Sequence, residues 1–399
     1  MSIYKIPITT AFLIFPFIAF LFTLPFLIYQ YRKYGSIPLL RSIIFYSFIL
    51  YLISAYFLVI LPLPSIDYVE SLKTPITQLI PFNFIKEITN LSWDFTNITT
   101  FLETLKEPVF YIAAFNILLT IPFGIYLRYY FECSWKKTFI FGFLLSLFFE
   151  VTQLSGLYGI YPRPYRLFDV DDLILNTFGT MLGFFITPLF NLVLPTRKEL
   201  DEKSFKKGKR VTFFRRSLAF LIDFFFIVLI SVITLLILYN TTITEYSILI
   251  TLIIYYLILP LLTNGKTLGK IILKLQVISK NETKWHYLKV ELRYLLSYIF
   301  FYYQIVIIEV LNNINLSSEI FKTTINLSII ILRVYFILNV ISIVMSIFKK
   351  EKVLLYEKIT NTTTISTIEY EEEQEEKDGK EETNVRIKKD NKKVFKWYK

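Results

Sequence analysis

Residues 138–194 read TFIFGFLLSLFFEVTQLSGLYGIYPRPYRLFDVDDLILNTFGTMLGFFITPLFNLVL and place two apolar runs on either side of a short polar connection. Each run, 138–156 and 172–194, has about 20 residues, the length that a helix needs to cross a hydrocarbon core of roughly 30 Å. Lipid offers no hydrogen-bond partner to an open backbone, so runs of this length must be helical. The stretch therefore predicts two membrane-spanning helices joined by a polar loop.

The composition of the whole chain agrees with this interpretation. Hydrophobic residues make up 54% of the 399 residues, and only 19% are charged. A soluble protein of this length needs more charged surface, whereas lipid-facing helices need almost none. We therefore predict an all-α fold, a polytopic transmembrane helical bundle.

Nine apolar runs are long enough to be membrane spans: they lie near residues 9–29, 42–61, 109–127, 138–156, 172–194, 217–239, 247–264, 294–312 and 325–348. Lys and Arg are concentrated in every second connecting loop, most densely at 197–216. Because loops rich in Lys and Arg stay in the cytoplasm, this alternation predicts an external N-terminus and a cytoplasmic C-terminus. The polar connection 157–171 would then face outward.

The formal net charge of +11 comes from these basic loops, which can also contact anionic lipid. We therefore expect membrane lipid, and no nucleic acid, as a partner. Cys133 and His286 are the only residues of their kinds. An intrachain disulfide and a cysteine-based zinc site are thus excluded, and we expect neither a bound metal nor a cofactor.

The connection 157–171 and the two helix ends beside it are unusually polar for their setting. Ionisable groups at membrane depth are costly and so suggest function. The candidate outer polar site comprises Glu150, Gln153, Arg163, Arg166, Asp169, Asp172 and Asn176.

Helical spacing groups these side chains. Glu150 and Gln153 share one helix face, and Asp172 and Asn176 lie on one stripe of the next helix. The two faces are expected to meet, with Arg163 and Arg166 balancing the acids. The same stripe continues through Gly179 and Gly183, whose spacing permits close helix packing, within one chain or between two.

Three interpretations of this site remain open. The network can clamp two helices, with an Asp stabilised by the helix N-terminus. It can bind an anionic or peptidic group through an arginine. It can also be catalytic, with Glu150 and Asp172 as a carboxylate pair.

The order of these residues carries a family resemblance. The pattern E-x-x-Q, R, D-x-x-D-x-x-x-N-x-x-G-x-x-x-G, together with LIPF at 79–82, resembles the VanZ-like family over roughly residues 40–190. The resemblance implies a multi-pass protein of the bacterial cytoplasmic membrane. Some members of that family are associated with resistance to glycopeptide antibiotics of the teicoplanin type.

A second resemblance begins after the basic linker. RSLAFLID at 216–223 and NGKTLGKIILKLQVI at 264–278 resemble the RDD family over roughly residues 212–366. The family's later aspartate corresponds to Glu357 in LYEKITNT, so this chain keeps the charge on a longer side chain. The candidate RDD-like site comprises Arg216, Asp223, Lys270 and Glu357. Asp223 lies inside a predicted span and needs a partner, which Arg216 or another basic side chain can supply.

We therefore predict a VanZ-like membrane domain at 1–200, an RDD-like membrane domain at 201–366 and a charged, disordered cytoplasmic tail at 367–399. The predicted function is a cell-envelope role, and the VanZ-like resemblance implies that this role is glycopeptide resistance. One alternative is a transporter of ions or small solutes, with a path lined by Asp223, Glu309 and Arg333. Another is an envelope enzyme that uses the outward carboxylate pair. The corresponding partners are a cell-wall precursor, a glycopeptide, an ion or a small solute.

Overall fold

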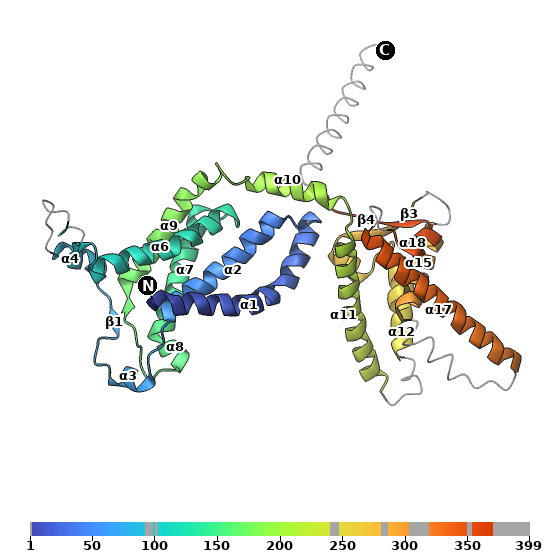
Figure 1. Ribbon diagram of the computed structural model, residues 1–399, viewed down its shortest axis with the longest axis horizontal. Helices are drawn as coiled ribbons and strands as arrows, with labels where there is room; N and C mark the ends of the chain where they lie inside the picture. The colour runs from blue at the N-terminus through green and yellow to red at the C-terminus, as the bar shows by residue number, and fades with distance from the viewer. Residues whose placement is uncertain are drawn as a thin grey trace, which may run out of the picture. The chain divides into compact units, whose positions relative to one another are not determined.

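The computed structural model describes residues 2–91, 99, 103–239, 247–280, 286–302, 319–348 and 353–369. By contacts, the chain divides into two compact units (Figure 1). Unit 1 comprises Met1–Pro25 and Pro38–Glu202, and unit 2 comprises Phe26–Ile37 and Lys203–Lys399. The described part is mostly helical.

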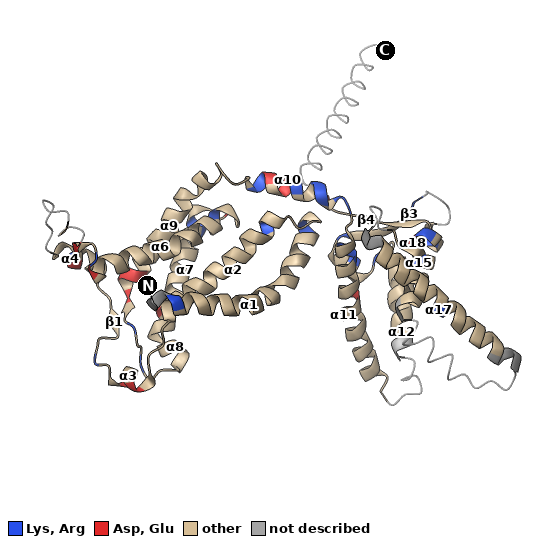
Figure 2. Cartoon of the chain, viewed as in Figure 1, with Lys and Arg blue, Asp and Glu red and all other residues tan. Residues whose placement is uncertain are grey.

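Seven helices in the described part are long and apolar enough to cross a membrane: Lys5–Tyr34, Leu39–Ile60, Pro108–Tyr129, Trp135–Leu154, Val170–Phe190, Phe213–Ile237 and Thr323–Met345. Figure 2 shows that charged residues are sparse along these helices and gather near their ends and on α10 (Arg197–Gly208). The chain is therefore a multi-pass membrane protein by length and composition of its helices.

For two of the nine predicted spans, the described helices differ from the predicted ones. The run predicted at 247–264 forms a series of short pieces, α12 (Ser247–Ile253), the π-helix η2 (Ile254–Ile258) and α13 (Leu259–Leu262). The run predicted at 294–312 begins earlier, as α15 (His286–Tyr302), and its residues 303–312 lie outside the described residues. Glu309 and the tail residues 370–399 also lie outside them.

Unit 1 is built on the first part of α1 (Ser2–Tyr34), up to Pro25, and on the long helices α2 (Leu39–Ile60), α6 (Pro108–Tyr129), α7 (Trp135–Leu154) and α9 (Val170–Phe190). Helix α9 packs against both α6 and α7 (Figure 1). Gly179 and Gly183 face α6, where an added Cβ would overlap the carbonyl oxygens of Ile117 and Ile121. The glycine stripe therefore packs within the chain, an arrangement that the sequence had left open.

Short elements close one end of unit 1. They are α3 (Ile66–Ser71), α4 (Asn83–Thr89), α8 (Gly156–Gly159) and two short strands, β1 (Thr77–Gln78) and β2 (Phe168–Asp169). The strands pair in parallel, with Thr77 opposite Phe168 and Gln78 opposite Asp169. This pairing brings the long loop between α2 and α6 to the polar connection before α9.

Unit 2 contains α11 (Phe213–Ile237), the 247–262 pieces, α14 (Leu268–Ile272), α15, α17 (Glu319–Phe348) and α18 (Leu355–Ile359). Strands β3 (Leu275–Ser279) and β4 (Thr362–Ser366) pair antiparallel, with Leu275 opposite Ser366 and Ser279 opposite Thr362. The two small sheets show that the fold is mostly helical and not wholly so. Alternate residues of β3 are buried, and Val277 joins the core with Tyr255 and Tyr294.

Candidate functional site

The outer polar site surrounds a cavity of about 280 Å³ in unit 1. Its polar lining comes from three helices and from the connection before α9: Asn116 on α6, Glu150 and Gln153 on α7, Arg166, and Asp172 and Asn176 on α9. Apolar side chains such as Phe115 and Phe149 complete the wall. The cavity therefore combines several hydrogen-bonding groups with an apolar surround, as ligand pockets do.

Glu150 is held at the end of α7 by the backbone that starts α9. Its side chain is 2% exposed, and one carboxylate oxygen accepts a hydrogen bond of 3.0 Å from the backbone N–H of Asp169. Asp169 is the N-cap of α9, since its carboxylate accepts from the N–H of Asp171 at 2.8 Å. Burial raises the pKa of the Asp169 carboxyl above its usual range.

Asp171 anchors the long loop between α2 and α6. Its two carboxylate oxygens accept from the backbone N–H groups of Phe82 at 2.5 Å and Phe84 at 2.8 Å. Phe82 adopts a left-handed backbone with φ of 62°. The LIPF segment is thus bound to the start of α9, a contact that the sequence analysis did not predict.

Asp172 and Asn176 point to the same cavity from successive turns of α9. The Asn116 side-chain amide donates to Asp172, and the Asn176 amide donates to the hydroxyl of Ser146 at 3.1 Å. Asn176 is 3% exposed, and its Oδ1 finds no partner among the described residues. Asn116 was missed by sequence reasoning, although an amide inside the apolar run 109–127 was a usable signal.

The two predicted arginines are placed differently. Arg166 lines the cavity and donates to the carbonyl of Leu61 at 3.2 Å. Arg163 donates to the carbonyls of Leu72 and Thr74 and so ties the connection to the neighbouring loop. Of the predicted cluster, Glu150, Gln153, Arg166, Asp172 and Asn176 line the cavity, while Asp169 contacts Glu150 through its backbone.

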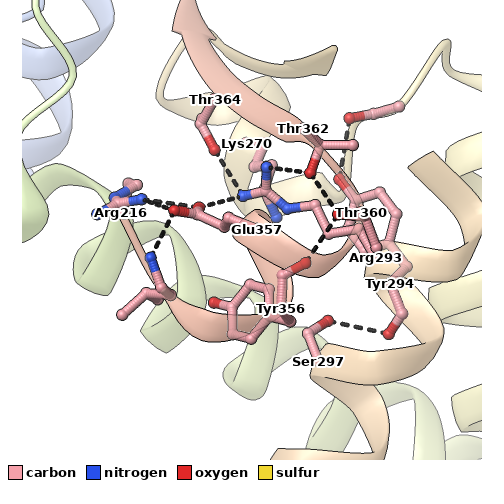
Figure 3. A network of polar contacts seen from close by, with 12 residues as sticks. Arg216, Lys270, Arg293, Tyr294, Ser297, Tyr356, Glu357, Thr360, Thr362 and Thr364 are labelled. Carbon is pink, nitrogen blue, oxygen red and sulfur yellow. Dashed lines mark hydrogen bonds and ion pairs between the residues drawn. The ribbon is translucent and has the colours of Figure 1, made fainter. Parts of the chain in front are cut away.

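The RDD-like site surrounds a second cavity, of about 300 Å³, in unit 2. All four predicted residues line it: Arg216, Asp223, Lys270 and Glu357. Arg293 of α15 joins them (Figure 3). Arg293 was not among the predicted site residues, because nothing in the local sequence distinguishes it from the other positive charges of the chain.

Glu357 is the centre of the charged network. It is 2% exposed and accepts from Arg216 at 2.8 and 3.0 Å and from Arg293 at 2.7 Å. Figure 3 shows the two arginines on two sides of the carboxylate. Glu357 also accepts from the backbone N–H of Leu354 at 3.0 Å, so it caps the start of α18. Arg293 additionally donates to Thr364 of β4 at 2.7 Å.

Asp223 is satisfied by neutral donors. Its oxygens accept from the hydroxyls of Tyr255 at 2.6 Å and Thr267 at 2.7 Å, and from the backbone N–H of Gly269 at 2.7 Å. An added Cβ at Gly269 would overlap the carbonyl of Ala219, so glycine lets the backbone reach the carboxylate. The partner anticipated for Asp223 was a basic side chain; Arg216 instead pairs with Glu357.

Lys270 lies beside this network. Its ammonium donates to the hydroxyl of Thr267 at 3.3 Å and stands 4.9 Å from the ring centre of Tyr294. The side chain is partly exposed because it borders the cavity. Burial lowers the pKa of Lys270 to about 8, despite the opposing effect of Asp223.

Arg215 is a second residue that sequence reasoning missed. It is fully buried and donates to backbone carbonyls of Gly35, Gly208, Leu273 and Lys274 and to the Ser366 hydroxyl. It therefore joins segments of unit 2 that are far apart in sequence. Arg333, proposed for a transport path, lies exposed on α17. Within the described residues, no cluster of His, Cys, Asp and Glu could hold a metal ion.

Fold and sites together define a multi-span membrane protein with one polar cavity in each of two units. The chain carries a VanZ/LLP1 domain at residues 48–191, followed by an RDD family domain at residues 210–361. Both family resemblances are thereby confirmed. Among curated proteins and among solved structures, no match was found.

Proposed function

We propose that the protein acts at the bacterial cell envelope by binding a cell-wall precursor or a glycopeptide in the outer polar cavity. All of the lining of this cavity except Pro7 lies within the VanZ/LLP1 domain, which supports an envelope role over one centred on unit 2. The observation that carries the proposal is the convergence of Glu150, Asp172 and Asn176 on one cavity in a membrane helix bundle. Such groups are costly at membrane depth, and their presence therefore supports a role in binding or chemistry.

The chemistry of the cavity favours a ligand that donates hydrogen bonds. Two carboxylates, Glu150 and Asp172, face a single arginine, Arg166, so acceptor groups are in excess. The unpartnered Oδ1 of Asn176 adds another buried acceptor. Buried polar groups without partners cost free energy, so an ammonium or amide N–H would be favourable here. Peptidic envelope components and glycopeptides both carry such groups.

The proposed setting is the cytoplasmic membrane, with the N-terminus outside and the C-terminus inside. Lys and Arg in alternate loops support this orientation. In this orientation the connection before α9, whose Arg166 lines the cavity, faces the cell wall. Nine spans would satisfy this topology, provided that the 247–264 and 294–312 runs also cross.

The test is glycopeptide susceptibility of cells that express the full chain. Glu150→Gln and Asp172→Asn keep side-chain size and remove the charges, and each should lower the minimum inhibitory concentration of teicoplanin toward that of cells without the protein. Asp67→Asn removes an exposed acid of α3 and is the matched control. If Glu150→Gln and Asp172→Asn reach the membrane in the same amount as the parent and protect cells as well as the parent and Asp67→Asn do, the outer polar site has no such role.

Turnover and transport are competing predictions. An enzyme would convert purified envelope precursors to products of changed mass, and Glu150→Gln would stop this. A transporter would produce flux in proteoliposomes that Asp223→Asn abolishes. No geometric observation favours transport, since the oxygens of Asp223 already accept three hydrogen bonds and Arg333 is exposed.

A further inference from the structure

The cavity of unit 2 has an excess of positive charge. Its charged lining among the described residues consists of three cations, Arg216, Lys270 and Arg293, and two carboxylates, Asp223 and Glu357. Glu357 is paired with both arginines, and Asp223 is satisfied by two hydroxyls and a backbone N–H. One cation, Lys270, is thus left without a carboxylate that is hydrogen-bonded to it.

Lys270 is placed to receive an anion from the cavity. Among the described residues, its ammonium contacts the Thr267 hydroxyl at 3.3 Å and the face of the Tyr294 ring at 4.9 Å, neither of which carries a negative charge. The fall of its pKa to about 8 reflects the cost of holding an ammonium here. An anionic group beside Lys270 would remove that cost and form a charge-assisted hydrogen bond.

Besides hydroxyl side chains such as Ser217 and Ser297, the cavity wall has an apolar part that belongs to membrane helices. Phe220 and Leu221 come from α11, and Ile343 comes from α17. Both helices are apolar enough to span a bilayer, and Leu221 of α11 is 61% exposed. The cavity therefore joins a cationic site to the region that hydrocarbon chains would occupy.

We propose that this cavity binds an anionic phospholipid, whose phosphate contacts Lys270 and whose acyl chain lies along Phe220, Leu221 and Ile343. Arg216, at the start of α11 and 17% exposed, adds a second positive charge near the headgroup. The predicted topology places this end of α11 in the cytoplasmic leaflet, where anionic lipids attract Lys and Arg. The site is separate from the outer polar cavity and does not depend on its role.

The experiment is native mass spectrometry of the full-length protein in a neutral detergent. Dioleoyl phosphatidylglycerol, dioleoyl phosphatidylcholine and inorganic phosphate are the three probes. Both lipids carry a phosphate, but the choline ammonium cancels its charge and is repelled by the excess positive charge of the cavity. We therefore expect one phosphatidylglycerol to bind about tenfold more tightly than phosphatidylcholine. Lys270→Gln should remove the preference, and Lys270→Arg, which keeps the charge, should retain it.

Lys266→Gln is the matched control, because Lys266 lies just before α14, the helix that carries Lys270, and does not line the cavity. It should leave the preference unchanged. Equal binding of the two lipids to the parent protein would overturn the proposal. An equal loss of the preference for phosphatidylglycerol in Lys270→Gln and Lys266→Gln would also overturn it. Lys270-dependent binding of inorganic phosphate as tight as that of phosphatidylglycerol would show a free-anion site and likewise overturn it.

Discussion

Glu357 shows how one side chain can organise a charged site. Its carboxylate accepts hydrogen bonds from Arg216, from Arg293 and from the backbone N–H of Leu354 at the start of α18. In sequence, Arg293 is 64 residues from Glu357 and Arg216 is 141 residues from it. A local pattern can indicate the carboxylate but not both of its partners.

Substitution of Glu357 should therefore destabilise the protein. Glu357→Gln leaves the nearly buried Arg293 without its counter-charge, and we expect the free energy of unfolding to fall by about 3 kcal/mol. Thermal unfolding in detergent would measure this as a lower melting temperature. Glu357→Asp keeps the charge but shortens the reach, so its loss should be smaller. A Gln variant as stable as the parent would contradict the bridging role.

Lys270 should make stability depend on pH. It faces Asp223 and Arg216 of α11, Arg293 and Tyr294 of α15, and Glu357 of α18. Its pKa is lowered from 10.5 to about 8, so between these values the folded protein has lost a proton that the unfolded chain still holds. Stability from this group therefore rises with pH across that window and is lost as pH falls through about 8.

Melting temperatures of the parent and Lys270→Gln at about pH 7.5 and pH 9.5 would measure this contribution. When the pH is raised, the melting temperature of the parent should rise more, or fall less, than that of Lys270→Gln. Binding of an anion should respond in the opposite direction, because it needs the protonated ammonium. Identical pH responses of parent and variant would show that Lys270 does not titrate in this range.

At the scale of helices, the stripe on α9 determines how closely α6 can approach. The GTMLG spacing predicted a small-residue face, but its partner was decided by packing: Gly179 and Gly183 meet the backbone of α6. The acids of the same stripe turn to the cavity beside α7. Sequence periodicity identifies a face, and only the folded chain shows which helix covers it.

Gly183→Ala tests this close approach. The new methyl group would overlap the carbonyl oxygen of Ile121, so the two helices must separate, and we expect a loss of about 2 kcal/mol or more. Gly142→Ala on α7 is a graded comparison, since its methyl would lie 2.8 Å from the Thr180 Cβ, a smaller overlap than the closer approach to the Ile121 oxygen at Gly183. The loss of stability in Gly142→Ala, measured by thermal unfolding, should be smaller than that in Gly183→Ala. A greater loss for Gly142→Ala would contradict the packing argument.

For the molecule as a whole, the orientation in the membrane is open to a direct test. Cys133 is the only cysteine, so a Cys133→Ser background permits single-cysteine labelling. Ile160→Cys is in the connection before α9, and Lys207→Cys is on α10; both positions are exposed. With the predicted topology, a membrane-impermeant maleimide should label position 160 in intact cells and position 207 only after permeabilisation.

The reverse labelling pattern would invert the topology. The outer polar cavity would then face the cytoplasm, and binding of wall material at that site would be refuted. Labelling of both positions in intact cells would show that one of the intervening segments does not separate them. Detergent-solubilised protein is the control, because both cysteines should react there.

The sequence by itself determined the membrane class, most of the spans and the presence of the VanZ/LLP1 and RDD domains. These are local properties, since about 20 successive apolar residues are enough to make a span. It also selected Arg216, Asp223, Lys270 and Glu357, which the structure brings to one cavity. Tertiary structure alone decided that Arg293 and Asn116 join the sites, that β1 pairs with β2 and that LIPF binds Asp171. Those contacts join residues far apart in the chain, and their formation depends on packing and burial that no local pattern records.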